Sequence, residues 1–203
     1  MSVPNDRRPW PMKWILIAIV LVIVPYTFLT LRYRRPGPAF QPYDDMKNRA
    51  NVARLLEAGF RRIAIPAQRP ADGIRPRAGA VISPVAGGWP AELRSTLVET
   101  PALPAEITNI TAAPRANTLQ PYEVQFTCSL PDHRKQLGGA ELFIRGESIV
   151  IAPTFELIAG TLQARTPLTD VLLTIPAGVL APGSYTVTLI AERGSSSWAL
   201  EVK

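Results

Sequence analysis

A chain of 203 residues has room for one folded domain of ordinary size with additional segments, and its formal net charge of +6 points to anionic partners. Cys128 is the only cysteine and His133 the only histidine, which excludes an intramolecular disulfide and any metal site drawn mainly from Cys and His. Much of the positive charge lies between Lys13 and Arg94, so it characterises the N-terminal part and not the whole chain.

The first predicted element is a membrane-spanning helix over residues 14–31, WILIAIVLVIVPYTFLTL. This stretch has no charged side chain, and as a helix it would be roughly 27 Å long, close to the thickness of the hydrocarbon core of a bilayer. Trp14, Tyr26 and Tyr33 lie near its ends, where aromatic side chains anchor spans to the interface. Pro25 would kink this helix without preventing it from spanning a membrane.

A cleaved signal peptide is the alternative interpretation of the same segment. Such a peptide ends in small residues at its cleavage site. Here the bulky residues Tyr26, Phe28 and Leu29 occupy that region. We therefore favour an uncleaved anchor behind a short basic tail, residues 1–13.

Charge does not decide the orientation of the span, because the basic residues before it are balanced by those that follow it. A short tail followed by a β-rich domain suits a signal anchor, which leaves the tail in the cytoplasm and exports the domain. We therefore expect the C-terminal domain on the exported side. The basic residues are Arg7, Arg8 and Lys13 before the span, and Arg32, Arg34 and Arg35 after it.

Residues 32–65 are predicted to hold a Pro/Gly spacer and then an amphipathic helix close to the membrane. The prolines and the glycine in RRPGPAFQP would end the membrane helix. In the next segment, YDDMKNRANVARLLEAGFRRI, Asp44 or Asp45 can cap the N-terminus of a helix, and Gly59 suits a C-terminal stop.

The predicted helix has an apolar face and a basic face. Val52, Leu55 and Leu56 follow the helical period on one side, while Lys47 and Arg54 recur on another. Anionic lipid would explain the basic face in the cytoplasm, and a protein partner or the chain's own domain would explain the apolar face outside it. A packed helix with a solvated basic face explains the same pattern, whereas nucleic-acid reading is disfavoured because no DNA-binding motif is present. The candidate partner or lipid contacts are Lys47, Arg49, Val52, Arg54, Leu55 and Leu56.

Residues 66–105 are rich in Pro, Ala and Gly and are predicted to form a semi-extended linker. The prolines recur too closely for a long helix or a central strand. A short edge strand within 79–85 and a helix of about two turns within 91–99 are the regular elements that this linker could add.

The residue pattern changes at residue 106, from which short runs of Val, Ile, Thr, Leu and Phe alternate with turn residues. This pattern predicts an antiparallel β-sandwich over residues 106–203. Alternation is clearest near the start, where Val124, Phe126 and Cys128 share one face of a strand. The expected strands cover 106–111, 122–130, 140–146, 148–153, 155–164, 170–175, 184–192 and 197–203.

LAPGSYTV, residues 180–187, resembles the corner before the sixth strand of immunoglobulin-like domains, such as those that end some membrane-anchored bacterial envelope proteins. The resemblance implies that Tyr185 is the corner tyrosine, with its hydroxyl bonded back to the backbone, and that Val187 takes the place of the second core cysteine. Cys128 would stand for the first cysteine, and the third strand lacks the Trp that antibody domains carry there. The resemblance concerns the fold over residues 106–203 and implies no function.

No residue pattern for catalysis stands out. Alternation places Cys128 inward, away from any base, and His133 lies in a polar turn. Asp44 and Asp45 are adjacent and therefore about 100° apart on a helix, which is poor geometry for paired catalytic carboxylates. No phosphate-binding loop or G-x-S-x-G element is present in the sequence. We therefore expect no enzymatic activity, cofactor, metal or small-molecule substrate.

The sequence as a whole predicts a mainly β protein, with a C-terminal immunoglobulin-like antiparallel β-sandwich preceded by an N-terminal transmembrane helix and a juxtamembrane amphipathic helix. We expect a non-enzymatic interaction module in the bacterial inner membrane with a periplasmic domain, whose partners are the lipid bilayer and a membrane or envelope protein, and not nucleic acid. A signalling or regulatory membrane protein, or an enzyme with an unrecognised site, are the alternatives. The expected segments are 1–13, 14–31, 32–65, 66–105 and 106–203.

Overall fold

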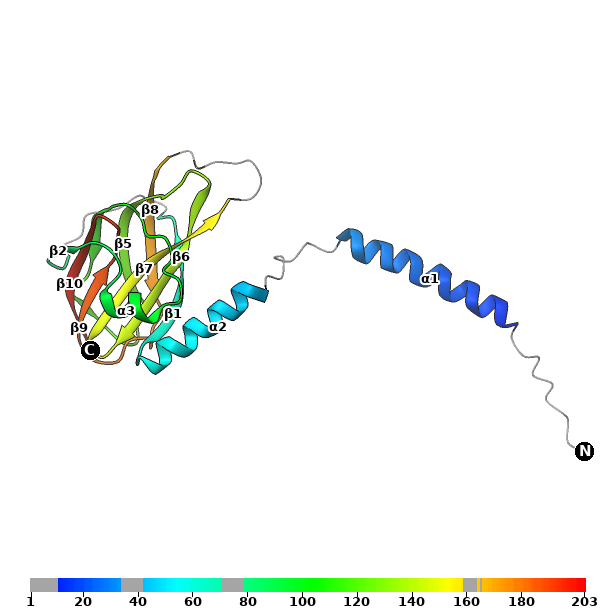
Figure 1. Ribbon diagram of the computed structural model, residues 1–203, viewed down its shortest axis with the longest axis horizontal. Coiled ribbons are helices and arrows are strands. Elements are labelled where there is room, and N and C mark those ends of the chain that lie inside the picture. Colours follow the sequence, from blue (N-terminus) through cyan, green and yellow to red (C-terminus); the bar gives the residue numbers. More distant parts are fainter. Residues whose placement is uncertain (1–10, 34–41, 71–78, 159–163, 165) are drawn as a thin grey trace, which may run out of the picture. The chain divides into compact units, whose positions relative to one another are not determined.

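The computed structural model describes residues 11–33, 42–70, 79–158, 164 and 166–203 (Figure 1). The chain divides into two compact units, Met1–Pro42 and Tyr43–Lys203. Most of the predicted basic tail and of the Pro/Gly spacer lies outside the described residues, and so do the side chains of Asp44 and Asp45 with their expected capping role.

The first unit contains one helix, α1 (Met12–Tyr33), within its described residues. Residues Met12–Thr30 have a mean hydropathy of 2.2, and none of this stretch is buried within the described structure. Thr27 and Thr30 donate their hydroxyls to the carbonyls of Ile23 and Tyr26 inside the helix, at 2.7 and 2.6 Å. The predicted helix over 14–31 is thus confirmed, and its length and composition fit a membrane span.

The second unit begins within α2 (Pro42–Glu57), which ends two residues before Gly59, the C-terminal stop that the sequence indicated. Gly59 adopts a φ of 77°, in the left-handed region that favours glycine. Its N–H bonds the carbonyl of Leu56 at 3.0 Å, and the N–H of Phe60 bonds the carbonyl of Leu55 at 2.7 Å. These two bonds form a Schellman stop, and the side chains of Phe60 and Leu55 join the same buried cluster.

The rest of the second unit is a ten-stranded sheet with one short helix, α3 (Ala91–Thr96). The strands lie in the order β2-β10-β9-β7-β6-β1-β8-β5-β3, and β4 adds a parallel pairing to β10. One neighbouring pair within that order, β7 with β9, is also parallel. The strands are β1 (Arg61–Gln68), β2 (Ser83–Ala86), β3 (Ile107–Ala112), β4 (Arg115–Ala116), β5 (Tyr122–Ser129), β6 (Lys135–Arg145), β7 (Ser148–Leu157), β8 (Leu168–Ile175), β9 (Gly183–Leu189) and β10 (Gly194–Val202).

Strand β1 holds the two halves of this sheet together. Residues 61–66 pair with β6, whereas Ala67 and Gln68 pair with β8, so one strand belongs to both halves. The two ends of the strand order also approach each other, because the N–H of Ala80, just before β2, bonds the carbonyl of Ala112 in β3 at 2.7 Å. The sheet therefore curls round until its edges nearly close.

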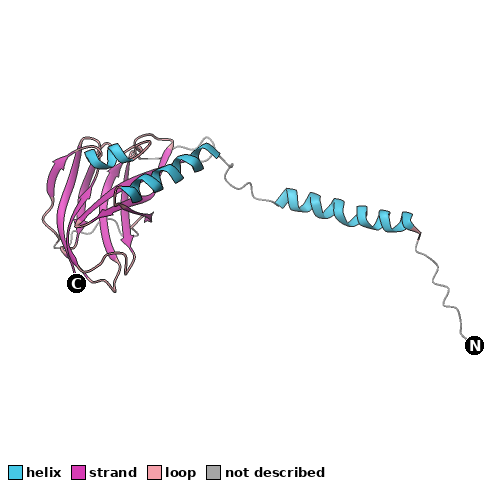
Figure 2. Ribbon diagram, turned by 60° about the horizontal axis from the view of Figure 1, so that its bottom comes forward, coloured by secondary structure: helices cyan, strands magenta, loops and turns pink. Residues whose placement is uncertain are grey.

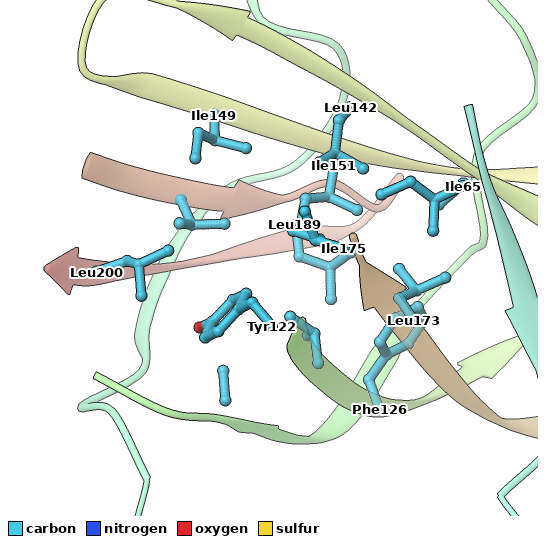
Figure 3. Close-up of a cluster of buried hydrophobic side chains, with 14 of the residues drawn as sticks. Ile65, Tyr122, Phe126, Leu142, Ile149, Ile151, Leu173, Ile175, Leu189 and Leu200 are labelled. Carbon is cyan, nitrogen blue, oxygen red and sulfur yellow. The ribbon is translucent and has the colours of Figure 1, made fainter. Parts of the chain in front are cut away.

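The inner face of the curled sheet encloses the main hydrophobic core (Figure 3). Its one buried polar pair is fully satisfied among the described residues: the Trp198 indole donates to the Tyr122 hydroxyl at 3.1 Å, and that hydroxyl donates to the carbonyl of Ala113 at 2.9 Å. The alternation predicted for 122–130 is confirmed, since Val124, Phe126 and Cys128 are all 0% exposed. Other members of this core are Ile65, Leu142, Ile149, Ile151, Leu173, Ile175, Leu189 and Leu200.

A second hydrophobic cluster, which we call the outer cluster, covers the opposite side of the same strands, away from the main core. In β6 and β7, Leu142 and Ile151 face the main core while their neighbours Phe143 and Val150 join the outer cluster. This is why both strands read as continuous apolar runs and not as alternating ones. Figure 2 shows α2 and α3 against one side of the strands. The cluster consists of Leu55, Phe60, Leu93, Leu97, Leu103, Phe143, Val150, Ala152 and Ile190.

The second unit is mainly β, but the interval 66–105 is not the linker that its prolines suggested. The edge strand and the short helix expected within it are present as β2 and α3, but its described part also contains the end of β1, and Leu93, Leu97 and Leu103 are buried in the outer cluster. Residues 61–65, expected in the region of the amphipathic helix, also form strand and not helix. The expected strands 148–153 and the described start of 155–164 are one strand, β7.

A glycine is expected to be required at position 139, where β6 lies close to the backbone of β1. A Cβ atom at this position would lie 2.6 Å from the backbone oxygen of Ile65, which cannot swing aside as a flexible side chain would. We expect Gly139→Ala to lower the free energy of unfolding by about 1–3 kcal/mol, the usual cost of overpacking. Gly194→Ala is the matched control, because nothing lies within 4 Å of the added Cβ. Urea denaturation of both variants would measure this, and equal stabilities would contradict the close approach.

Candidate functional site

One face of α2 is fixed to the rest of the second unit. Leu55 is 1% exposed in the outer cluster. The Asn51 side-chain oxygen accepts a bond from the Val98 N–H at 2.8 Å, and Lys47 forms an ion pair with Glu99. The hydrogen bond and charge of Lys47 hold the pKa of the Glu99 carboxyl below its usual value. Three contacts along one side of α2 therefore hold it against the segment that follows α3.

The opposite side of α2, which we call its outer face, is exposed and largely apolar. Met46, Val52 and Leu56 are 67%, 45% and 65% exposed, and Arg49 and Ala53 between them are exposed too. At about 100° per residue these positions lie across the helix from those that contact the domain. A solvent-facing helix surface normally carries polar residues here. The outer face is defined as Met46, Arg49, Val52, Ala53 and Leu56.

The structure thus separates the six contact candidates that the sequence grouped together. Leu55 belongs to the protein's own core, and Lys47 is paired within the domain. Val52 and Leu56 are exposed on the outer face with Arg49, whereas Arg54 is exposed on the same side of the helix as Lys47, about 20° from it. The split follows from helix geometry, because adjacent residues such as Leu55 and Leu56 point about 100° apart.

A second candidate is a groove of about 440 Å³ beside α3. Its apolar lining includes Phe60, Leu93, Val150 and Ile190, and Trp89 stands at its wall. The Trp89 ring meets Phe143 edge to face, with ring centroids 5.9 Å apart.

Polar side chains also line this groove, among them Arg145 and Glu92. The guanidinium carbon of Arg145 lies 4.5 Å from the centroid of the Phe60 ring, and the same side chain pairs with Glu92 of α3. Sequence reasoning did not find this groove, because its lining residues come from separate segments of the chain and no local spacing connects them. Only the aromatic and glycine-rich run GGWP, residues 87–90, marks the place in the sequence.

The structure places the reactive side chains as packing or loop residues. Cys128 is 0% exposed, and its burial, with the charge of Asp170, raises the pKa of the thiol to about 12. His133 is exposed in the turn before β6. Within the described part of the chain, no three His, Cys, Asp or Glu side chains gather closely enough to hold a metal ion.

The buried phenol of Tyr122 and the buried thiol of Cys128 are expected to make the folded state less stable at high pH. Burial raises the pKa of Tyr122 to about 12 from its ordinary value of 10.0, and that of Cys128 to about 12 from 9.0. Both groups stay neutral in the folded protein up to about pH 12, whereas in the unfolded chain they ionise at their ordinary pKa values, 9.0 for the thiol and 10.0 for the phenol. The free energy of unfolding is therefore unaffected by the ionisation of these groups below about pH 9 and falls as the pH rises toward 12. We expect the urea midpoint to fall across this window, and to fall less steeply in Cys128→Ala.

Thiol labelling supplies a second measurement of the same burial. At pH 8 the Cys128 thiol is expected to react with iodoacetamide only after the protein is unfolded in urea. Rapid labelling of the folded chain would contradict both the inward position of Cys128 and the raised pKa of its thiol.

Comparison of the chain with family models, with curated proteins and with solved structures found no match. The features that bear on its function are α1, the outer face of α2 and the surface of the rest of the second unit, which we call the β domain.

Proposed function

We propose that this chain is a single-pass, membrane-anchored, non-enzymatic protein of the bacterial cell envelope, which holds its β-rich second unit as an interaction module at the membrane. The observation that carries the proposal is α1. Its apolar side chains are exposed, and none of the window Met12–Thr30 is buried among the residues that the structure describes. Such a surface is costly in water and suited to the hydrocarbon core of a bilayer.

Within this proposal the second unit lies outside the cytoplasm, in the periplasm, and is a variant of the immunoglobulin-like sandwich. The hydroxyl of Tyr185 donates to the carbonyl of Ala181 at 3.0 Å, which supports the corner that the sequence resembles. In this variant β7 pairs with β9 in parallel, and β1 is shared by both halves of the sheet.

Charged substitutions in the middle of α1 test the anchor. One arginine at the centre of a span costs about 2.5–3.5 kcal/mol of insertion free energy, so Val20→Arg with Val22→Arg is expected to move the chain from the membrane to the soluble fraction. Val20→Leu with Val22→Leu is the control and should remain in carbonate-washed membranes. Release of the unmodified chain by carbonate would overturn the proposed anchor.

Reporters of topology test the orientation. A reporter that is active only outside the cytoplasm is expected to be active when fused after Tyr43 and after Lys203. Cytoplasmic signals at both positions would reverse the proposed orientation while leaving the anchor intact.

The interaction module is tested by photo-crosslinking in native membranes. Val81, Leu119 and Leu157 are exposed apolar residues of the described second unit, so each can carry a crosslinker without disturbing the core. A defined protein captured repeatedly from one of these positions and not from the others is expected. The same background at all three positions would contradict a specific protein partner.

A further inference from the structure

The outer face of α2 is an exposed apolar surface that the proposed anchoring does not by itself explain. Met46, Val52 and Leu56 are large side chains open to solvent on one side of a helix whose other side is already packed. A helix that served only to cover the domain would carry polar residues there. The outer face therefore has the composition of a surface that meets a second apolar phase.

The connection to α1 limits where this surface can be. Residues 34–41 separate Tyr33, the last residue of α1, from Pro42, the first of α2. Whatever its conformation, a connection of this length reaches no more than about 30 Å at 3.3–3.6 Å per residue. If α1 spans a bilayer, α2 begins within that distance of the end of the span, which is comparable to the thickness of one bilayer core. The nearest apolar phase is the membrane itself.

The charge on the outer face suits that position. Arg49 lies within the outer face and is exposed. Arginine can bury its aliphatic stem among apolar groups while its guanidinium reaches the phosphate layer. The contacts of Leu55, Asn51 and Lys47 fix the helix from behind, so the outer face can meet lipid while α2 stays folded on its domain.

We propose that the outer face of α2 lies in the lipid–water interface of the bilayer that α1 spans, with Met46, Val52 and Leu56 among the upper acyl chains. The inference rests on the proposed membrane anchor. It assigns α2 the role of a second, interfacial contact, which holds the β domain against the membrane surface in addition to tethering it.

Depth-dependent fluorescence quenching tests this contact in the full chain. Variants with one added cysteine, Val52→Cys and Leu56→Cys, are labelled with an environment-sensitive dye, while the native Cys128, which is 0% exposed, stays unlabelled. The labelled chains are reconstituted in vesicles of phosphatidylethanolamine and phosphatidylglycerol that carry a nitroxide either near the headgroup or deep in the acyl chain. Leu21→Cys in α1 and Leu119→Cys in the β domain are the controls, and circular dichroism verifies that each variant is folded.

The expected result is several-fold stronger quenching at positions 52 and 56 than at 119, with the shallow nitroxide more effective than the deep one. Quenching at 21 by the deep nitroxide but none at 52 or 56 would overturn the inference and leave the anchor standing. Absence of quenching at 21 would overturn the anchor itself. A blue-shifted dye at 52 that no nitroxide quenches would mean that a protein or a second copy of the chain covers the face, and would also overturn the inference.

Discussion

Leu55→Ala is expected to lower the free energy of unfolding of the second unit by about 2–5 kcal/mol, the range for removing a buried leucine side chain. Leu55 is 1% exposed and is the residue through which α2 enters the outer cluster. Urea denaturation of the full chain in detergent, followed by circular dichroism, would measure the change.

The adjacent residue supplies the control for this experiment. Leu56 is 65% exposed, so Leu56→Ala is expected to change the stability by no more than about 0.5 kcal/mol. Equal effects of the two substitutions would show that α2 is not attached to the domain by the face described above. A larger effect of Leu56→Ala would show that the helix is turned the other way.

Phe143→Ala is expected to have the largest effect on the β domain, about 3–5 kcal/mol. Phe143 is 0% exposed in β6, faces the outer cluster and meets the edge of the Trp89 ring. Its loss would open a cavity between the strands and the segment that includes α3. Thermal unfolding of the variant, compared with the exposed substitution Leu119→Ala, would measure it.

A small effect of Phe143→Ala would contradict the second cluster as a core in its own right. Retained native-like circular dichroism with a lowered unfolding midpoint is the expected pattern, since the main core on the inner face of the sheet is untouched by this substitution.

Local signals in the sequence predicted α1, the helix of α2 and the strand around Phe126. Each signal is carried by neighbouring residues: an uninterrupted apolar run, a helical period ending at Gly59, and a strict alternation. Such features are decided within a few turns or a few residues, and the structure has them at the expected places.

The role of the prolines could not be predicted in the same way. Pro66 is the last residue of β1 that pairs with β6, immediately before the strand pairs with β8, so its missing N–H falls at the change of partner. Pro84 lies in β2 at the end of the strand order, and Pro90 precedes the first turn of α3. Each of these positions tolerates proline. That tolerance depends on the pairing of strands that are distant in the sequence, so a segment rich in proline is interpreted as a linker when only its composition is known.

The sequence also could not predict which of the candidate contact residues of α2 are buried and which are exposed. The helical period groups Val52, Leu55 and Leu56 on one broad apolar face. Which part of that face packs inward depends on Phe60, Leu93 and Phe143, which come from other segments of the chain. The sequence therefore identified the helix and its residues, whereas the outer face emerged from burial.

The central place of β1 has a consequence for synthesis. The pairing of Arg61 with Ile144 and of Ala67 with Leu173 joins an early strand to two that are made much later. While the chain is being made, β1 has no strand to pair with until β6 emerges, and its last residues wait for β8. Because such distant pairings form slowly, the nascent chain carries β1 as an unpaired strand while residues 69–134 are made. A chaperone that binds extended apolar segments would find its substrate there.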